Sequence, residues 1–223
     1  MKKLSFLVAF LLLLSSTFVP VKAVSDGPDE IGPLEFTVIS SYTSTFNPDS
    51  ANRSTNIILS ADAINGTVLK PGDEFSFNRA VGPRTADRGY KSAQIISGGK
   101  YVNGIGGGIC QVSGTLFNAA VLAGMEITER RNHGLKIGYL PDGRDATVSW
   151  GTIDLRFRNT ADAEIIILIS IESGVLEVRF VTYDEYTPPA TEVIVTVKSS
   201  RRYEMSTYIS GELFQTFTSA YSG

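Results

Sequence analysis

A glycine-rich run that leads directly into a helical pattern spans Gly104 to Gly124, with the sequence GIGGGICQVSGTLFNAAVLAG. After Cys110, the only cysteine, apolar residues recur at helical spacing until Gly124 supplies a stop signal. These apolar residues are Val112, Leu116, Ala119, Ala120 and Ala123. The glycines let the backbone adopt positive φ and approach other groups closely before the helix begins. The run predicts a buried helix of about four turns that is entered through a tight turn.

Cys110 lies in the first turn of this predicted helix. Unpaired backbone amides and the positive end of the helix dipole stabilise a thiolate there, and in such settings they lower a cysteine pKa from about 8.5 to roughly 3.5–7.5. Cys110 is therefore a candidate nucleophile. The competing interpretation is a small buried residue after a tight turn, because free cysteine is among the most buried residue types.

The first 23 residues have the pattern of a secretory signal peptide, with two early lysines, a long apolar run and a small residue, Ala23, at the cleavage site. Removal of 1–23 takes away three lysines and no acid, which changes the net charge from −3 to −6. A negative chain disfavours a nucleic-acid partner. We expect a secreted or extracytoplasmic protein of the cell envelope with no membrane span after removal of the signal.

A single cysteine allows no internal disulfide, so the stability of an exported chain of this length must come from a hydrophobic core. About 200 residues can supply one. A free thiol outside the cytosol is open to oxidation unless it is buried or used. This exposure to oxidants strengthens the interpretation of Cys110 as a functional residue.

The residue pattern predicts a linker at 24–33, a main domain at 34–186 and a small β appendage at 193–223. The linker is rich in glycine, proline and acids, and Pro188-Pro189 marks the second boundary. The main domain begins with an alternating strand at 36–42, followed by a helix that is capped at Ser54 or Thr55 and ends at Asn65-Gly66. The buried face of that helix consists of Ile57, Ala61 and Ile64.

Hairpins are predicted at 93–102 and 164–183, around the turns Ser97-Gly98-Gly99 and Ser173-Gly174. Further strands are predicted at 133–139 and within 148–157, and 79–89 is predicted as a surface loop, either fully solvated or lining a cleft. Together these elements predict an α+β fold in which two short helices precede an antiparallel sheet.

The only histidine, His133, follows Cys110 at the start of a predicted strand. A nucleophile at a helix N-terminus, then a histidine on a strand, then an acid on the next strand is the chain order of papain-like and transglutaminase-like sites. In such sites histidine takes the thiol proton and the acid fixes the tautomer of the ring. Coincidence of the two residue types is the competing interpretation.

Two acids compete for the third role. If the 133–139 strand pairs with the next strand through a turn at Gly143 or Arg144, Asp154 lies opposite His133. Asp145 would then lie near the turn, ~30 Å farther along the ladder. Asp154 therefore ranks above Asp145, and a looser loop would reverse the order.

The backbone amides of Cys110 and Gln111, or the Gln111 side chain, could stabilise an oxyanion, although Gln111 fits a cap or surface position equally well. Gly106, Gly107 and Gly108 form the turn against which a substrate would lie. The glycine run has neither the lysine of a P-loop nor the third glycine of a dinucleotide site, so no nucleotide cofactor is predicted. One cysteine and one histidine would leave a zinc site dependent on carboxylates, so no metal is predicted either.

Four motifs in order resemble the VanW-like family of bacterial exported proteins. They are PGDEFSFNRAVGPRT, GYKSAQII, GGGICQVSGTLFNAAVLAG and RNHGLKIGYLPDGRDATVSWGTIDLRFRN, and the resemblance covers about 52–183. It implies a Gram-positive envelope protein, since the family takes its name from glycopeptide-resistance gene clusters and is associated with the cell wall. The family's motif positions are retained here at 106–111, His133, Asp145 and Asp154.

Two functions are consistent with the sequence. The first is a cysteine hydrolase or acyltransferase acting on peptidoglycan stem peptides, with Cys110 as nucleophile, His133 as base, and Asp154 or Asp145 orienting the ring. The second is a non-catalytic wall-binding or accessory protein, linked to envelope maintenance or glycopeptide (vancomycin) resistance, in which Cys110 only packs. The sequence does not determine the oligomeric state.

Overall fold

The protein folds around one helix, α3 (Ile109–Leu122), in a computed structural model that describes residues 35–222. Gly108, with a φ of 109°, precedes the helix, and Gly124, with a φ of 74°, follows it. Gly124 and Met125 donate their N–H groups back to the carbonyls of Val121 and Ala120, which is the Schellman pattern of a helix C-terminus. The predicted helix and its stop signal are confirmed.

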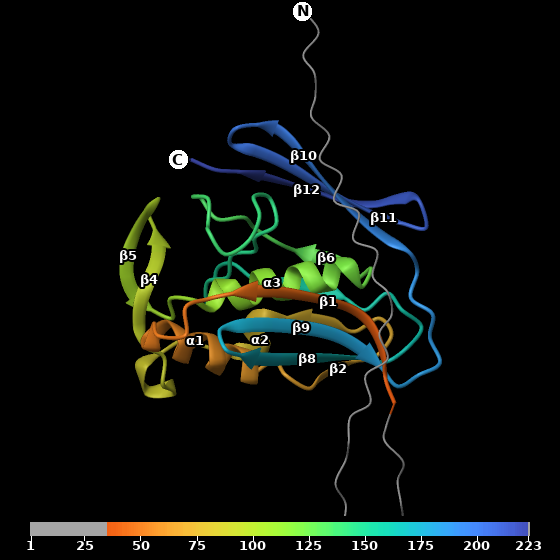
Figure 1. Cartoon of the computed structure of the whole chain (residues 1–223), viewed down its shortest axis with the longest axis horizontal. Helices are drawn as coiled ribbons and strands as arrows, with labels where there is room; N and C mark the ends of the chain where they lie inside the picture. The colour runs from red at the N-terminus through yellow and green to blue at the C-terminus, as the bar shows by residue number, and fades with distance from the viewer. Residues whose placement is uncertain (1–34, 223) are drawn as a thin grey trace, which may run out of the picture.

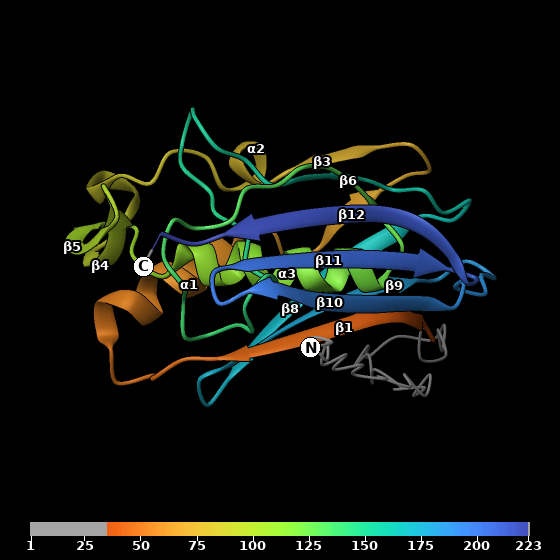
Figure 2. The same ribbon diagram turned by 90° about the horizontal axis from the view of Figure 1, so that it is seen from above.

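Two sheets lie on either side of α3 (Figures 1 and 2). The four-stranded antiparallel sheet has the order β1-β9-β8-β2, and the three-stranded antiparallel sheet has the order β10-β11-β12. Their bounds are β1 Thr37–Thr45, β2 Thr67–Leu69, β8 Ile165–Glu172, β9 Val175–Thr182, β10 Thr191–Ser199, β11 Arg202–Ile209 and β12 Glu212–Ala220. Twelve of the fourteen α3 residues are buried, so this helix is core on all sides and has no solvent face.

Smaller elements complete the shell around α3. A second three-stranded sheet has the order β3-β7-β6, and a separate hairpin, β4–β5, projects beyond the start of α3 (Figure 1). The bounds are β3 Glu74–Ser76, β4 Ser92–Ser97, β5 Lys100–Ile105, β6 Glu126–Glu129, β7 Arg156–Arg158, α1 Ala51–Asp62, α2 Phe77–Val81 and a 3₁₀ turn at Ala86–Arg88. None of the helices between residues 35 and 222 is long and apolar enough to cross a membrane.

Several predicted elements are confirmed by the structure. The first strand and both hairpins form. The predicted apolar face is buried, with Ile57 and Ala61 on α1 and Ile64 in the turn after it each no more than 2% exposed. Helix α1 begins at Ala51, earlier than the predicted caps Ser54 and Thr55. Ser54 is instead a buried helical residue whose hydroxyl donates to the carbonyl of Pro48 at 3.1 Å.

The predicted α+β class, with two short helices before an antiparallel sheet in papain-like or transglutaminase-like order, is wrong. The described residues form twelve strands in four sheets and three α-helices, so the protein is mostly β. Strand β1 precedes α1, and it pairs with β9, which lies 130 to 145 residues later. Pairing between such distant segments leaves no mark on local periodicity, and this explains the error in the predicted class.

The predicted strand at 133–139 does not form, and only β7 and an isolated bridge between Ser149 and Ile153 appear where a strand was expected within 148–157. Gly134 and Gly138 weaken a strand, and Pro141 follows closely. The chain from His133 to Asp154 instead wraps as a loop around the N-terminal end of α3.

The residues predicted as a C-terminal appendage pack onto the same core. Met205 of β11 is fully buried within the main hydrophobic cluster, and Phe217 of β12 meets Phe117 of α3 edge to face at 5.5 Å between ring centroids. The predicted signal peptide at 1–23 and linker at 24–33 lie outside the described residues.

Candidate functional site

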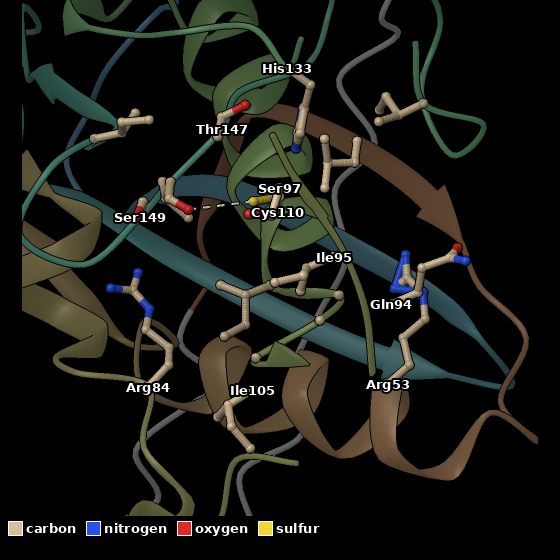
Figure 3. A pocket seen from close by; sticks show the side chains of 18 of the residues that line it. Arg53, Arg84, Gln94, Ile95, Ser97, Ile105, Cys110, His133, Thr147 and Ser149 are labelled. Atoms are coloured by element: carbon tan, nitrogen blue, oxygen red, sulfur yellow. Dashed lines mark hydrogen bonds between the residues drawn. The ribbon is translucent and has the colours of Figure 1, made fainter. Parts of the chain in front are cut away.

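A cleft of about 730 Å³ opens beside the start of α3 (Figure 3). The glycine turn before α3, the β4–β5 hairpin and the segment 133–153 form most of its wall, and two arginines, Arg53 and Arg84, border it. We call it the Cys110 cleft. It contains five of the predicted site residues, which are Gly106, Gly107, Gly108, Cys110 and His133.

The glycine turn is pressed against the backbone of β4. A Cβ on Gly107 would lie 2.6 Å from the carbonyl oxygen of Gln94 and 2.7 Å from the carbonyl carbon of Ala93. The buried amide of Asn56 donates to the carbonyls of Gly107 (2.9 Å) and Lys91 (3.0 Å). The turn therefore has a fixed position, and it delivers Cys110 to the cleft at the start of the helix.

Cys110 is partly buried, and its sulfur lies 3.6 Å from the carbonyl oxygen of Val148, to which the thiol donates. The ring of His133 points toward the same sulfur (Figure 3). Burial opposes ionisation of the thiol, but the interaction with His133, the backbone of Val148 and the charge of Arg84 together place the pKa of Cys110 below its ordinary value. The surroundings favour a thiolate.

Asp145 holds His133 at two points. Its Oδ2 accepts from the backbone N–H of His133 at 2.6 Å and lies 2.7 Å from the ring Nδ1. Because an ionised carboxylate only accepts hydrogen bonds, Nδ1 carries the proton and Nε2 is the ring nitrogen left to face Cys110. The carboxylate thus sets both the position of the ring and its tautomer.

Asp145 is itself fully buried and fully paired. Its Oδ1 accepts from the hydroxyl of Tyr221 at 2.7 Å and lies 3.4 Å from Nη2 of Arg130. Burial would raise the pKa of Asp145, but the hydrogen bonds from His133 and Tyr221 and the charge of Arg130 lower it below its ordinary value. Asp145 therefore stays ionised opposite the ring.

The ionised Asp145 and the Cys110 thiol both favour the charged imidazole. Burial works against this charge, but the hydrogen bond with Asp145 and the interaction with Cys110 outweigh it and raise the pKa of His133 to about 9. A lowered thiol pKa beside a raised imidazole pKa shifts the pair toward thiolate and imidazolium. Such a pair is chemically competent for nucleophilic attack and for proton return to a leaving group.

The structure places Asp154 and Gln111 away from this pair. Asp154 accepts from the hydroxyl of Ser76 at 2.6 Å and from the backbone N–H of Asn78 at 2.8 Å, so it fixes the junction of β3 and α2. Gln111 is fully buried, does not line the cleft, and holds Arg53 through its Oε1 at 2.7 Å. The ranking of Asp154 above Asp145 rested on a strand pairing that does not form.

Two polar groups at the wall of the Cys110 cleft have no protein partner among residues 35–222. They are the backbone N–H of Cys110 and the buried hydroxyl of Thr147, and both residues line the Cys110 cleft. The backbone N–H of Gln111, the other predicted oxyanion donor, is already bonded to the carbonyl of Gly108 at 2.9 Å. Of the predicted oxyanion donors, only the backbone N–H of Cys110 is therefore free to bind a developing oxyanion.

Sequence reasoning missed Arg53, Arg84, Thr147 and Tyr221 as residues of this region. Arg84 falls in the 79–89 loop, for which lining a cleft was one of the two interpretations, and the structure shows that it does line one. Arg53 and Tyr221 lie 57 residues before and 111 residues after Cys110 in the chain, and no local pattern links them to it.

The fold and the cleft together define a class: a mostly β protein that carries a Cys-His-Asp cluster at the N-terminal end of its central helix. The family model described as VanW like protein matches residues 52–181, and the chain belongs to this family. The match includes Cys110, His133 and Asp145, and it ends before β10, so Tyr221 lies outside it.

Two relatives share a 126-residue stretch with this chain. The uncharacterized protein YoaR of Bacillus subtilis is 52% identical over 56% of this chain and 42% of its own length. The vancomycin B-type resistance protein VanW of Enterococcus faecalis is 36% identical over 54% of this chain and 46% of its own length. The similarity thus spans less than half of either relative. No solved structure matches the chain.

Proposed function

We propose that this protein is an extracytoplasmic cysteine acyl-transfer enzyme, a hydrolase or a transferase, that acts on peptidoglycan stem peptides. The observation that carries the proposal is the arrangement of Asp145, His133 and Cys110 in one line of contacts at the wall of the Cys110 cleft. Membership of the VanW-like family, and a relative named for vancomycin resistance, direct the choice of substrate toward the cell wall.

In the proposed reaction, the Cys110 sulfur attacks the carbonyl carbon of a peptide bond while its proton resides on Nε2 of His133. The carbonyl oxygen becomes an oxyanion that the Cys110 amide is placed to stabilise. Collapse breaks the C–N bond, and His133 returns the proton to the departing amine. The resulting thioester then reacts with water, giving hydrolysis, or with an amine, giving transfer, and the thiol is regenerated.

Asp145 contributes by position and charge and not by accepting the proton. Its hydrogen bond to Nδ1 keeps Nε2 toward the sulfur, and its negative charge stabilises the imidazolium that persists until the amine leaves. In this proposal Arg130 and Tyr221 keep the carboxylate ionised and immobile.

The proposal is tested by incubating purified protein with synthetic stem peptides and with isolated peptidoglycan. We expect released or exchanged peptide products and, after acid quenching, a protein mass increased by the acyl group. Cys110→Ala and His133→Ala should each abolish both signals while keeping the fold by circular dichroism, and their losses should be comparable because the two residues act as a unit.

A non-catalytic wall-binding or accessory role is the second candidate. The thiol–Val148 contact favours it, because a neutral thiol that donates to a carbonyl is a satisfied packing group. Binding of peptidoglycan by the native protein without any product or acyl-protein, and equal binding by Cys110→Ala, would establish this role in place of catalysis. Export is proposed from the pattern of residues 1–23, and a mature N-terminus after Ala23 in intact-mass analysis of secreted protein would support it.

A further inference from the structure

Two arginines from distant segments border the Cys110 cleft. Arg53 comes from α1 and Arg84 from the loop after α2, and Figure 3 shows them on opposite sides of the Cys110 sulfur. One nitrogen of each is held by an amide oxygen: Nη2 of Arg53 by Gln111 at 2.7 Å, and Nη1 of Arg84 by Asn78 at 2.6 Å. Both guanidinium groups are therefore fixed in position before any ligand arrives.

The remaining terminal nitrogens have no partner among the described residues. Nη1 of Arg53 and Nη2 of Arg84 are buried without a hydrogen bond, and neither arginine pairs with a carboxylate between residues 35 and 222. Burial lowers the pKa of both guanidinium groups below the ordinary value. Both side chains are half-buried, and Asp154 acts on Arg84 without forming an ion pair with it. A partly desolvated cation without a carboxylate in contact favours an anionic ligand.

The glycine turn is shaped to admit these side chains. A Cβ on Gly108 would lie 2.8 Å from Nη1 of Arg53, and a Cβ on Gly106 would lie 3.4 Å from the Cβ of Arg84. Gly108 and Gly106 precede Cys110 by two and four residues, so the free nitrogen of Arg53 and the stem of Arg84 reach the same short turn that presents the sulfur.

The Cys110 thiolate cannot compensate the positive charges of both Arg53 and Arg84. Burial opposes its formation, His133 contributes most to overcoming this, and Arg84 contributes last among the neighbours that lower the Cys110 pKa. A single sulfur already paired with an imidazolium cannot satisfy two guanidinium groups on opposite sides of it. Two separate anionic groups, one on each side of the sulfur, would satisfy both guanidinium groups.

The cleft that the arginines border is partly apolar and of ligand size. Ile95, Ile105 and Trp150 line it, and the volume of about 730 Å³ lies within the ~300–1,000 Å³ of small-molecule and peptide sites. The guanidinium of Arg84 also stacks over the rings of Phe77 and Trp150, at 5.3 and 5.9 Å from their centroids. These surfaces suit the aliphatic parts of a peptide between its charged groups.

We infer that the acyl donor of this enzyme is an acidic peptide that carries a carboxylate on each side of the reacting carbonyl, one bound by Arg53 and the other by Arg84. The inference rests on the proposed function, because Cys110 defines which carbonyl reacts. It excludes neutral glycans as the group bound beside Cys110, and a peptide whose carboxylates are converted to amides is a poor ligand.

The anion site can be tested without turnover by comparing two alkylating agents. Iodoacetate and iodoacetamide both transfer a carbon to the Cys110 thiolate with loss of iodide, and they differ only in a carboxylate against an amide. We expect the iodoacetate-to-iodoacetamide rate ratio, measured by intact mass at pH 7, to exceed that of free glutathione at least tenfold. Arg53→Gln and Arg84→Gln should each reduce the ratio, and the double variant should return it to the glutathione value.

Matched variants separate charge from folding. Arg201→Gln removes the same charge from an exposed turn outside the cleft and should leave the ratio unchanged. Arg84→Lys keeps a cation where Arg84→Gln does not. It should therefore retain part of the preference for iodoacetate over iodoacetamide, even if the stacking on Trp150 is lost. Circular dichroism of each variant confirms that a changed ratio does not come from unfolding.

Protection of Cys110 by a peptide with two carboxylates tests whether Arg53 and Arg84 each bind one of them. Acetyl-Glu-Ala-Ala-Glu-amide should protect Cys110 from iodoacetamide, its Gln-for-Glu counterpart should protect at least tenfold less well, and each arginine substitution should remove part of the protection. Equal protection by both peptides, or an alkylation ratio unaffected by the double substitution, overturns the inference. Acyl transfer with an unaffected alkylation ratio supports the proposed function and overturns only the inference about the donor. A clear anion preference without any acyl transfer overturns the proposed function and leaves an anion-binding cleft beside Cys110 without an acyl donor.

Discussion

One oxygen of Asp145 binds His133 twice, accepting from the backbone N–H at 2.6 Å and lying 2.7 Å from Nδ1 of the ring. The carboxylate thereby takes the backbone hydrogen that a β-ladder would have used, and the chain at His133 turns toward the cleft instead of pairing with a strand. The same carboxylate oxygen that occupies the backbone N–H of His133 also orients the imidazole toward Cys110.

Asp145→Asn should therefore weaken the reactivity of Cys110. Without the negative charge the imidazolium is less stable, so the thiolate loses part of its counter-ion and the thiol pKa rises. The rate of Cys110 alkylation by iodoacetamide at pH 6 should fall by about tenfold for each unit of that rise. The measurement is the pH profile of the alkylation rate.

Asp154→Asn is the matched control for this variant, because it changes the same group in the other candidate. Asp154 bonds Ser76 and the backbone of Asn78 and not His133, so the variant should lose ~1–3 kcal/mol of unfolding free energy with an unchanged alkylation profile. The opposite result, an altered profile in Asp154→Asn and a normal one in Asp145→Asn, would return the orienting role to Asp154.

The pH dependence of Cys110 itself follows from the directions of its pKa and that of His133. The thiol pKa is lowered, so the reactive thiolate persists below the ordinary thiol range and decreases only as the pH falls through the lowered value. The His133 pKa of about 9 keeps the imidazolium in place throughout neutral pH. Alkylation in native protein should therefore be fast at pH 6.

In His133→Ala, burial is no longer outweighed by the neighbouring cation, so the thiol pKa rises. Alkylation at pH 6 should slow strongly and recover at alkaline pH. A thiol that merely packs would instead react slowly at every pH in both proteins until they unfold, and that pattern would rule out an activated Cys110.

The glycine turn gives a prediction about stability. Gly108→Ala should cost ~1–3 kcal/mol, since the residue has a φ of 109° and its Cβ would meet the side chain of Arg53. Gly107→Ala should cost ~1–3 kcal/mol for a different reason, because its φ is not positive but its Cβ would overlap the backbone of β4.

Gly138→Ala is the control for both variants, because it lies in the segment that wraps the cleft, has no positive φ and would place its Cβ in open space. Its unfolding free energy should stay within ~0.5 kcal/mol of the native protein. Thermal or denaturant unfolding measures all three, and equal stability of the three variants would show that the turn has no special packing.

Much of the fold could be predicted locally. The α3 helix, the β4–β5 and β8–β9 hairpins and the C-terminal strands carry their own periodicity and turn residues, such as Gly98-Gly99 and Ser173-Gly174. Of the site, Cys110 and His133 were identifiable because each is the only residue of its type. The choice between Asp145 and Asp154 could not be made from the sequence, since it depended on whether the chain after His133 forms a strand.

Contacts over long sequence distances were beyond local patterns. The partner of β1 is β9, the side chain that fixes Arg53 belongs to Gln111, and the hydroxyl that bonds Asp145 comes from Tyr221, 76 residues later. In each case the residue type at either end is ordinary, and only the packing of α3 against two sheets brings the ends together.

Tyr221→Phe tests one of these distant contacts. The variant removes a hydroxyl that donates to Asp145 and accepts from the backbone N–H of Gly143, and it should cost ~0.5–1.5 kcal/mol for each lost bond. A positioning role predicts in addition a shift of the Cys110 alkylation profile to higher pH. Tyr203→Phe removes the hydroxyl of a β11 tyrosine that is bonded to Lys136 and not to Asp145, and it should leave that profile unchanged. Identical profiles in the two variants would reduce Tyr221 to a packing residue.

The bond between Tyr221 and Asp145 also sets an order of events during biosynthesis. Cys110, His133 and Asp145 are all translated at least 76 residues before the tyrosine that completes the surroundings of the carboxylate. A nascent chain that ends before residue 221 already contains Cys110, His133 and Asp145, but it lacks the Tyr221 hydroxyl. The full set of contacts around Asp145 therefore forms only after Tyr221 has been synthesised, and we expect a nascent chain arrested before residue 221 to carry a less reactive Cys110 thiol.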